Sequence, residues 1–498
     1  MGWAFWIFLL TGGAAAAQGA HRSYDQQRAA LLVPMLSAVL RFPTVAGNDE
    51  ARLAQQAWLH QAGATLDLTV RDAGPVTEVE LPGPGDAPVL GLLVHGDVQP
   101  VEEAAWTTPP FKGVVKPGFV FGRGSADDKG PLVQALLAMA ALRDSGMPRT
   151  YTIRLLVGSD EESTNLDIAT YLKSHRPPDL SLVLDSAFPV VVGEKAWNAL
   201  YLTTPLSERA SESRLPYEVA TLEAGLSPSI VPDEARIVLR WRSGAAAWDP
   251  LSARLRKRSL PSGIRLEVRP EGERLTVVAH GKSAHGGVNL EGGRNALVAL
   301  ATALEGVLPA GGADDLLAAA RAAGSDLYGG GFGLGASVPL WGHHTVNVAT
   351  LKPVNGGHRL VINLRRVPPL TGPDLKAHLE HWTAAFNQKT GAHLIADGFY
   401  QDEPLVFDPN SKIVKRLMAA YTRATGEATH PAISGGGTYA KRMPNSIAFG
   451  MWFPGKPYPG HDVDENVPVT DLQRGAHVLI EALVDLGCGD PIREPFKP

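Results

Sequence analysis

Residues 122–130 read Gly-Arg-Gly-Ser-Ala-Asp-Asp-Lys-Gly, and they lie between the apolar strand-like run 119–121 and the apolar run 131–142. Glycine allows the chain to turn sharply after a strand. Core packing gives no reason for the adjacent carboxylates of Asp127 and Asp128 in such a turn. The stretch therefore predicts a strand–turn–helix unit of an α/β domain, with a ligand at the turn.

Short apolar runs of the length of buried strands occur on both sides of this turn, at 89–94, 153–157 and 180–184. Helical patterns at 131–145 and 166–174 separate them. Alternation of this kind is typical of an α/β domain with a largely parallel sheet. We therefore expect a doubly wound, mainly parallel sheet; that it belongs to a catalytic domain of the phosphorylase/hydrolase-like kind is implied by the family resemblance described below.

The pattern changes near residue 195, where pairs of strand-like segments are followed by helical ones. This change predicts an α+β, ferredoxin-like lid domain inserted into the first domain. The expected regions are a signal peptide (1–20), a first catalytic-domain segment (21–195), the lid domain (196–386) and a second catalytic-domain segment (387–498). The glycine-rich stretch 329–333 is expected to be an exposed turn, because its spacing fits no phosphate-binding motif.

Composition limits the class of protein. The chain has 498 residues, 44% of them hydrophobic and 19% charged, which is typical of a globular protein with more than one domain. A net charge of -5 without a basic block argues against nucleic-acid binding. The single cysteine, Cys488, excludes internal disulfides and thiolate zinc clusters. Any metal would therefore be held by histidine and carboxylate side chains.

The N-terminal residues 1–10 are apolar and lead into Ala14–Ala17. This pattern predicts a secretory signal peptide cleaved near Ala17 or Ala20, and hence export, with the periplasm as the expected destination. An uncleaved anchor and a mis-assigned start remain open, because no Lys or Arg precedes the run. The run is shorter than the roughly 20 residues that a membrane span needs. No second segment is long and apolar enough, so we expect no stable membrane insertion.

Acidic and imidazole side chains follow each predicted strand of the first domain. The residues concerned are His95 and Asp97, then Asp127, then Glu161 and Glu162, then Asp185, and finally His461. In open α/β sheets, ligands bind beyond the carboxyl ends of the strands. A single acid after a strand is usually a helix cap or part of a solvated loop. Five such segments in one chain indicate a site.

The chemistry of this set is that of a divalent metal site. Imidazole and carboxylate without thiolate suit zinc, manganese or cobalt. Asp127 is best placed to bridge two ions, and Asp97 is close enough to orient His95. Of the adjacent Glu161 and Glu162, one can bind metal while the other takes a proton from water.

The sequence resembles a known family at these motifs, from about residue 30 to the C-terminus. The family is the co-catalytic zinc metallopeptidases that include aminoacylase, carnosinase, desuccinylases and bacterial PepV-type dipeptidases. The segments 188–189 and 193–195 favour the PepV-like branch. The motifs that carry the resemblance are His95–Val98, Gly122–Gly124 with Asp127–Gly130, Asp160–Glu162, and Gly435–Ala440 ahead of His461.

The resemblance implies a role for each residue. One ion would be held by His95, Asp127 and Asp185, and the other by Asp127, Glu162 and His461. Glu161 would be the general base, and Asp97 would orient His95. The resemblance also implies that the peptide bond between Asp127 and Asp128 is cis.

The resemblance extends to the lid. His285, in the motif His280–His285, would polarise the scissile carbonyl as a donor to the developing oxyanion. Arg365 would bind the substrate carboxylate, because a guanidinium can contact both oxygens, although Arg366 remains an alternative. Gly437, in the run 435–437, would offer its backbone N–H to the same carboxylate. Two positions depart from the family pattern, Ser229 in place of Asn and Lys441 in place of Arg.

The expected function is that of a metal-dependent dipeptidase that hydrolyses short peptides with water activated by two ions. Zinc is the expected metal, with manganese or cobalt as alternatives, and a monomer is favoured over a homodimer. An N-acyl-amino-acid amidohydrolase of the aminoacylase kind is the nearest rival. A catalytically inactive peptide-binding protein is a remote one, because such a protein would not need Glu161.

Overall fold

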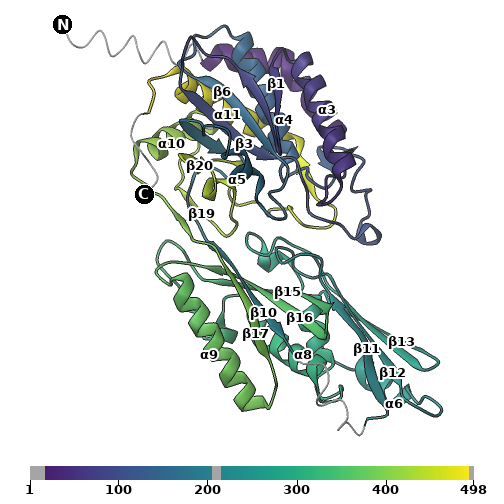
Figure 1. Ribbon diagram of the computed structural model, residues 1–498. Coiled ribbons are helices and arrows are strands. Elements are labelled where there is room, and N and C mark those ends of the chain that lie inside the picture. Colours follow the sequence, from purple (N-terminus) through teal and green to yellow (C-terminus); the bar gives the residue numbers. More distant parts are fainter. Residues whose placement is uncertain (1–16, 205–214, 493–498) are drawn as a thin grey trace. The chain divides into compact units, whose positions relative to one another are not determined.

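The computed structural model describes residues 17–204 and 215–492, and its contacts divide the chain into two units (Figure 1). Unit 1 comprises the described residues up to Glu194, then Leu405–Gly460, and those from Asp464 onward. Unit 2 comprises Lys195–Pro404 and the short segment His461–Val463. Apart from that short segment, unit 2 is a single insertion into unit 1, as expected from the sequence.

Unit 1 is built around a six-stranded sheet. The strand order is β1 (Thr69–Ala73), β2 (Val76–Leu81), β6 (Thr152–Gly158), β3 (Val89–His95), β7 (Leu180–Val183) and β20 (Ser446–Ala448). The pairs β6–β3, β3–β7 and β7–β20 are parallel, whereas β1–β2 and β2–β6 are antiparallel. The central strands β3, β6 and β7 are largely apolar, with Arg154 inside β6 and Ser181 inside β7 as exceptions, as is typical of a parallel sheet whose two faces are both covered by helices. The predicted fold class is confirmed.

Helices and short strands complete unit 1. The helices are α2 (Leu32–Val39), α3 (Asp49–Thr65), α4 (Lys129–Asp144), α5 (Asp167–Tyr171), α10 (Lys412–Thr425) and α11 (Val469–Cys488), with single turns η1 (Tyr24–Arg28), η2 (Ala29–Leu31), η3 (Glu103–Ala105) and η6 (Tyr439–Lys441). The small sheets join β4 (Val114–Lys116), β5 (Phe119–Phe121) and β22 (Asn466–Pro468), then β9 (Val191–Glu194), β18 (Leu405–Val406) and β19 (Ala432–Ser434), and finally β8 (Ser186–Ala187) and β21 (Met451–Trp452). Helix α4 is buried from Lys129 to Leu142, so the turn before it is attached to a well-packed element.

Unit 2 is an antiparallel eight-stranded sheet with its own core. The strand order is β13 (Arg265–Glu271), β14 (Arg274–His280), β12 (Glu234–Trp241), β11 (Tyr217–Ala224), β15 (Thr345–Val354), β16 (Gly357–Arg366), β10 (Ala196–Thr203) and β17 (Ile395–Gln401). Its helices are α6 (Asp249–Arg256), α7 (Ala296–Ala303), α8 (Gly312–Ala323) and α9 (Gly372–Thr390), with single turns η4 (Leu290–Gly292) and η5 (Gly330–Phe332).

Two expectations about unit 2 need correction. The predicted junction at residue 386 falls inside α9, and the unit continues to Pro404 because β17 pairs with β10. The stretch 329–333 is not simply an exposed turn. Phe332 within it is only 2% exposed, because its ring packs on Trp382 with ring centroids 4.7 Å apart.

The predicted signal peptide lies largely outside the described residues. Ala17 and Ala20, the two expected cleavage positions, are buried in the core of unit 1. Cleavage at either position would therefore have to precede folding. Within the described ranges, no helix is long and apolar enough to cross a membrane.

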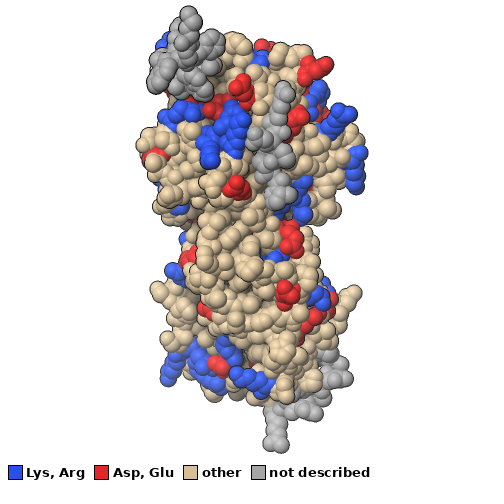
Figure 2. Space-filling model, turned by 90° about the vertical axis from the view of Figure 1, so that its left-hand side faces the viewer, with Lys and Arg blue, Asp and Glu red and all other residues tan. Residues whose placement is uncertain are grey.

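Charged side chains are scattered over the face drawn in Figure 2. Lys and Arg form separate groups there, with Asp and Glu between them. On this face, the described residues form no continuous basic band of the kind that follows a nucleic-acid backbone.

Candidate metal centre and active site

Four loops at one edge of the main sheet of unit 1 carry the predicted ligands. His95 ends β3, Glu161 and Glu162 follow β6, and Asp185 follows β7. These three strands are adjacent and parallel, so their carboxyl ends lie at the same edge. Asp127 lies in the turn that leads into α4.

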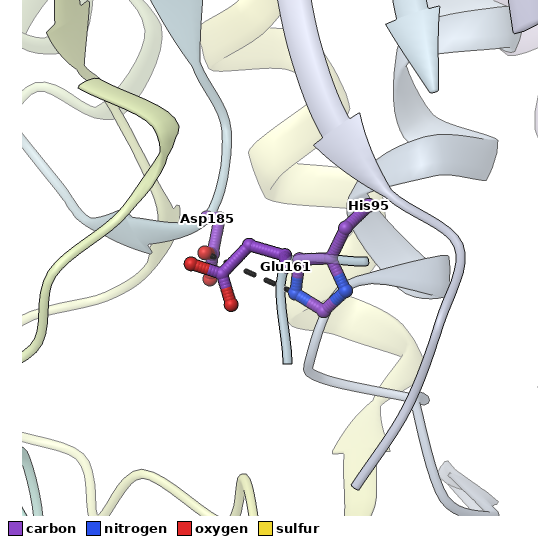
Figure 3. A group of neighbouring side chains, drawn as sticks. All are labelled: His95, Glu161 and Asp185. Atoms are coloured by element: carbon purple, nitrogen blue, oxygen red, sulfur yellow. Dashed lines mark ion pairs between the residues drawn. The ribbon is translucent and has the colours of Figure 1, made fainter. Parts of the chain in front are cut away.

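The structure brings five of the predicted side chains together. The ligand atoms of His95, Glu161 and Asp185 all lie within 4.8 Å of one another (Figure 3). The same limit holds for the ligand atoms of His95, Asp127 and Glu162. Nε2 of His95 is 2.9 Å from Oδ1 of Asp127 and 3.9 Å from Oδ2 of Asp185.

Negative charge is concentrated and buried at this cluster. Burial, followed by repulsion from Asp127 and Asp128, raises the pKa of Asp185 well above its ordinary value. Burial and the charge of Asp185 do the same for the pKa of Glu161. Burial alone would lower the pKa of His95, but the hydrogen bond to Asp127 and the neighbouring carboxylates raise it well above the ordinary value.

A divalent cation fits these residues. Ionised carboxylates are costly to bury unless a positive charge accompanies them. The converging atoms are imidazole nitrogen and carboxylate oxygen, the donor set that suits zinc, manganese or cobalt.

Asp97 orients His95 in a different way from the one expected. The Nδ1 atom of His95 is 3.0 Å from the main-chain carbonyl oxygen of Asp97, whereas the Asp97 carboxylate is 3.6 Å away. That carboxylate accepts the backbone N–H groups of Glu161 and Glu162, at 3.2 and 2.9 Å. Asp97 therefore connects two parts of the site: its carbonyl oxygen contacts the His95 ring, and its carboxylate binds the loop of Glu161 and Glu162.

The two adjacent glutamates have different amide partners. Gln99, which is 2% exposed, donates from Nε2 to Oε2 of Glu162 at 2.8 Å and to the Glu162 carbonyl oxygen at 3.2 Å. Asn165 donates from Nδ2 to Oε1 of Glu161 at 3.2 Å. Each carboxylate is thus held separately, and this allows the two to perform different tasks.

The turn of residues 122–127 is held by Glu465, which the sequence pattern did not identify. Its buried carboxylate accepts from Nη1 of Arg123 at 2.7 Å and from the N–H groups of Gly124, Ala126 and Asp127 at 3.1, 2.8 and 3.2 Å. The nearness of Glu465 to His461 was the only signal in the sequence.

The peptide bond between Asp127 and Asp128 is cis, which confirms the expectation. The Asp128 carboxylate accepts the backbone N–H of His95 at 3.1 Å and is fully buried. Asp128 therefore supports the strand end that carries His95.

Two further acids that the sequence pattern did not reveal hold neighbouring loops. Asp167 accepts the N–H groups of Ser159 and Asp160, at 2.8 and 3.0 Å, and the hydroxyl of Tyr439. Glu194 is fully buried and accepts from the N–H and hydroxyl of Thr438, at 3.1 and 2.7 Å. These contacts fix the loop after β6 and the glycine-rich loop 435–437.

His285 and His461 both belong to unit 2. Nδ1 of His285 accepts the backbone N–H groups of Gly287 and Val288, each at 3.0 Å. An imidazole nitrogen that accepts cannot also carry a hydrogen, so the proton of neutral His285 is on Nε2. His285 is thus set up as an Nε2–H donor. The ring of His461 stacks on that of His285, with centroids 4.4 Å apart.

His461 is in neither group of converging ligand atoms. It is part of the segment His461–Val463, which clusters with unit 2. Its role as a ligand to the second ion therefore stays a prediction.

Arg365 and Arg366 have different surroundings in unit 2. The Arg366 guanidinium donates to the carbonyl oxygens of Leu370 and Asp402 and, at 2.9 Å, to Glu403. Arg365 lies over the ring of Trp197, 6.0 Å from its centroid. Arg365 also has a hydrogen-bond partner, since its Nε donates to Oδ1 of Asn363 at 3.0 Å. The assignment of Arg365 as the carboxylate binder stays a prediction.

One backbone N–H of the glycine-rich loop 435–437 has an acceptor nearby in the chain. The N–H of Gly436 donates to Oγ of Ser434 at 3.0 Å. The described residues supply no acceptor for the N–H of Gly437. Its predicted contact with a substrate carboxylate remains a prediction.

Comparison with models of protein families shows to which family the chain belongs. A model described as Peptidase family M20/M25/M40 matches residues 91–485. The chain belongs to this family. Family M20 is a metal-dependent peptidase family, and the residues of this chain that could hold a metal are those just described.

Known proteins extend the comparison. Over 401 residues the M20 chain is 27% identical to the Beta-Ala-Xaa dipeptidase of Lactobacillus delbrueckii subsp. lactis, in a match that covers 80% of this chain and 82% of that protein. The structure of the di-peptidase Dug1p from Saccharomyces cerevisiae superposes with a TM-score of 0.57 at 14% identity, covering 94% of this chain and 98% of Dug1p. Human carnosine dipeptidase 1 gives 0.57 at 11% identity, with the same coverage. The two structures establish a shared fold.

Proposed function

We propose that the chain is a metal-dependent dipeptidase that hydrolyses the peptide bond of short peptides with two bound divalent ions. The observation that carries the proposal is the convergence of His95, Asp127, Glu161, Glu162 and Asp185, the first two buried and the other three half-buried, in a chain of peptidase family M20. The dipeptidase name of the Lactobacillus relative supports the choice of substrate.

The proposed ligand sets are those that the family resemblance implies. They differ from the two groups of converging atoms, in which Glu161 stands in place of Asp127 in the first set and His95 in place of His461 in the second. His95, Asp127 and Asp185 would hold one ion, and Asp127, Glu162 and His461 the other, with zinc as the proposed metal and manganese or cobalt as alternatives. Bound there, the ions supply the positive charge that makes a water molecule more acidic and a carbonyl carbon more electrophilic.

The protein's own groups would then move the proton and bind the substrate. Glu161, whose carboxylate Asn165 holds, takes a proton from the attacking water and later passes it to the leaving amine. The Nε2–H of His285 donates to the oxygen of the carbonyl under attack. Arg365, together with the N–H of Gly437, binds the free carboxylate of the peptide.

Substitution of the proposed base tests the mechanism. Glu161→Gln keeps the shape of the side chain but cannot accept a proton, so we expect turnover to fall by at least about 100-fold. Metal content, measured by elemental analysis, should stay at the wild-type level. Retained turnover would contradict the role of Glu161, and lost metal would make Glu161 a ligand instead.

Substrate class is tested separately. A panel of free dipeptides and N-acetyl amino acids, assayed with defined zinc or manganese loading, should show turnover of dipeptides that a chelator removes and added metal restores. Preference for N-acetyl amino acids would replace the proposal with an amidohydrolase. Binding of peptides without any turnover would indicate a binding protein.

We also propose that the chain is exported to the periplasm and acts as a monomer. The apolar N-terminal run supports export. The size of the lid inserted into the chain is the reason why we favour a monomer. Cell fractionation and light scattering after gel filtration test the two proposals.

A further inference from the structure

Two histidines from distant regions of the chain face each other in unit 1, outside the catalytic cluster. His21 precedes η1, and His477 lies on α11. Their Nδ1 atoms are 2.7 Å apart, and their ring planes are inclined by 31° with centroids at 4.9 Å. Both side chains are partly exposed, at 21% and 29%, so solvent ions can reach the pair.

The other nitrogen of each ring already has a carboxylate partner. Nε2 of His21 is 2.8 Å from Oε1 of Glu481, and Nε2 of His477 is 3.1 Å from Oδ1 of Asp25. Burial alone would raise the pKa of Glu481, but its contacts with His21 and Arg423 lower it, so this carboxylate is ionised. A carboxylate oxygen that contacts a ring nitrogen acts as the hydrogen-bond acceptor, so we place the hydrogen of each ring on Nε2.

With the hydrogen of each ring on Nε2, no hydrogen is left to lie between the two Nδ1 atoms if both rings are neutral. With both Nε2 atoms protonated, two neutral imidazoles would point Nδ1 lone pairs at each other across 2.7 Å, which is repulsive. Two imidazolium rings would point two N–H groups at each other. Burial and then the charge of His21 lower the pKa of His477, which opposes that doubly charged state. The arrangement therefore requires one positive species between the rings, either a shared proton or a metal ion.

We propose that His21 and His477 form a binding site for one borderline divalent transition-metal ion, such as Zn²⁺, Ni²⁺ or Cu²⁺, separate from the catalytic centre. Imidazole nitrogen is a preferred ligand for these ions. A histidine that binds metal typically donates its other ring N–H to a carboxylate, and both rings already do so.

The geometry needs only a small adjustment. Metal–nitrogen bonds of about 2.0–2.1 Å place two nitrogens about 2.9 Å apart at a right angle and about 3.3 Å apart at a tetrahedral angle. The rings would therefore separate by a few tenths of an ångström from the observed 2.7 Å. Only two protein nitrogens converge, so water would complete the coordination, and binding should be weaker than at a four-ligand site.

The groups that face the pair favour a cation. Asp25 and Tyr24 face it from η1 and Glu481 from α11. Arg423 on α10 contacts Glu481 at 2.9 Å, and its charge is shared with Asp485 at 3.1 Å. Binding of one divalent ion would release the one proton that the two rings share. Because protons then compete with the metal ion, binding should weaken as the pH falls.

The test compares ion stoichiometry between variants. Wild type, His21→Gln and His477→Gln are each titrated with Zn²⁺ and analysed by equilibrium dialysis and by calorimetry in buffers of different ionisation enthalpy. We expect wild type to bind one more equivalent than either variant and to release about one proton per extra ion. Glutamine retains an N–H donor for the carboxylate, and the two substitutions lie on different elements, so a folding defect in one leaves the other informative.

His60→Gln is the matched control, because His60 contacts Asp72 at 3.0 Å without a facing imidazole. It should bind as many ions as wild type, and dipeptide turnover should be unchanged in all three variants. Equal stoichiometry in wild type and both pair variants would mean that the pair holds only a proton, and would overturn the proposal. Loss of the extra ion in the His60 variant, or uptake without proton release, would also overturn it. The catalytic ions are common to every sample, so the difference does not depend on the proposed function.

Discussion

At the scale of single residues, the proposed ligands of this site depend on acids that lie outside the two groups of converging ligand atoms. Glu465, Asp167 and Glu194 each accept two or more hydrogen bonds from loops that carry or flank the site. The ligands were predictable because they follow predicted strands. The supporting acids were not, because the groups they hold are mostly hundreds of residues away in the chain, and no periodic pattern records such a pairing.

Glu465 provides the sharpest residue-scale prediction. Glu465→Gln leaves the buried guanidinium of Arg123 without its counter-charge and turns an amide group toward N–H donors. Breaking a buried pair in this way costs about 3–5 kcal/mol in the free energy of unfolding. Urea denaturation measures the loss. The exposed pair of Lys376 with Glu380 is the control, where Glu380→Gln should cost about 1 kcal/mol or less. Similar losses in both variants would refute a special role for Glu465.

His344 predicts a pH dependence of stability. Burial, and then the charges of Lys195, Arg366 and His343, lower its pKa to about 4, and its Nδ1 accepts the N–H of Val367 at 3.1 Å. Between about pH 6.5 and about pH 4, His344 is therefore protonated in the unfolded chain but neutral in the folded chain. The resulting stability is fully present above about pH 6.5 and is lost as the pH falls toward about 4, by at most about 3 kcal/mol.

The variant His344→Asn isolates this contribution. Asn can still accept the Val367 N–H but does not titrate, so the free energy of unfolding should depend less on pH between about 4 and about 6.5. Chemical denaturation at several pH values measures the difference. Identical pH profiles for the two proteins would show that His344 makes no such contribution.

At the scale of elements, the alternation of side chains along β16 separates its two arginines. Successive residues of a strand point to opposite faces. Arg365→Ala should raise KM for free dipeptides about 10- to 100-fold, the equivalent of a lost charged hydrogen bond, and should affect C-terminally amidated peptides much less. Arg366→Ala should instead lower the melting temperature with little change in KM. The reverse pattern would assign the carboxylate to Arg366.

The elements also show where sequence patterns succeed and where they fail. The strands β3, β6 and β7 were predictable because a parallel sheet buried on both faces selects continuous apolar runs. Strand β17 was missed because it is an edge strand whose residues are all exposed or half-buried, so no apolar alternation distinguishes it. The lid junction was therefore placed too early. The proposed ligands do not depend on such an alternation, because their chemistry rather than their hydrophobicity marks them in the sequence.

At the scale of the whole molecule, unit 2 has the attributes of an independent domain. It has a hydrophobic core of its own and an eight-stranded sheet with no described strand from unit 1. We therefore expect a fragment covering residues 195–404 to fold alone. Circular dichroism should show a single cooperative thermal transition. A gradual transition without cooperativity would mean that the lid depends on unit 1 for its structure.

The ends of the insertion lie side by side in unit 1. Strand β9 ends at Glu194, β18 begins at Leu405, and these two residues are partners in an antiparallel ladder. Apart from the short segment His461–Val463, the chain therefore leaves and re-enters unit 1 at one point, as it would through an ordinary hairpin turn. In evolutionary terms such a position accepts a new module without breaking an existing one, because any domain whose termini are close together can replace the turn. The same junction offers protein engineers a place to shorten or exchange the lid while the sheet that carries the ligands keeps its connectivity.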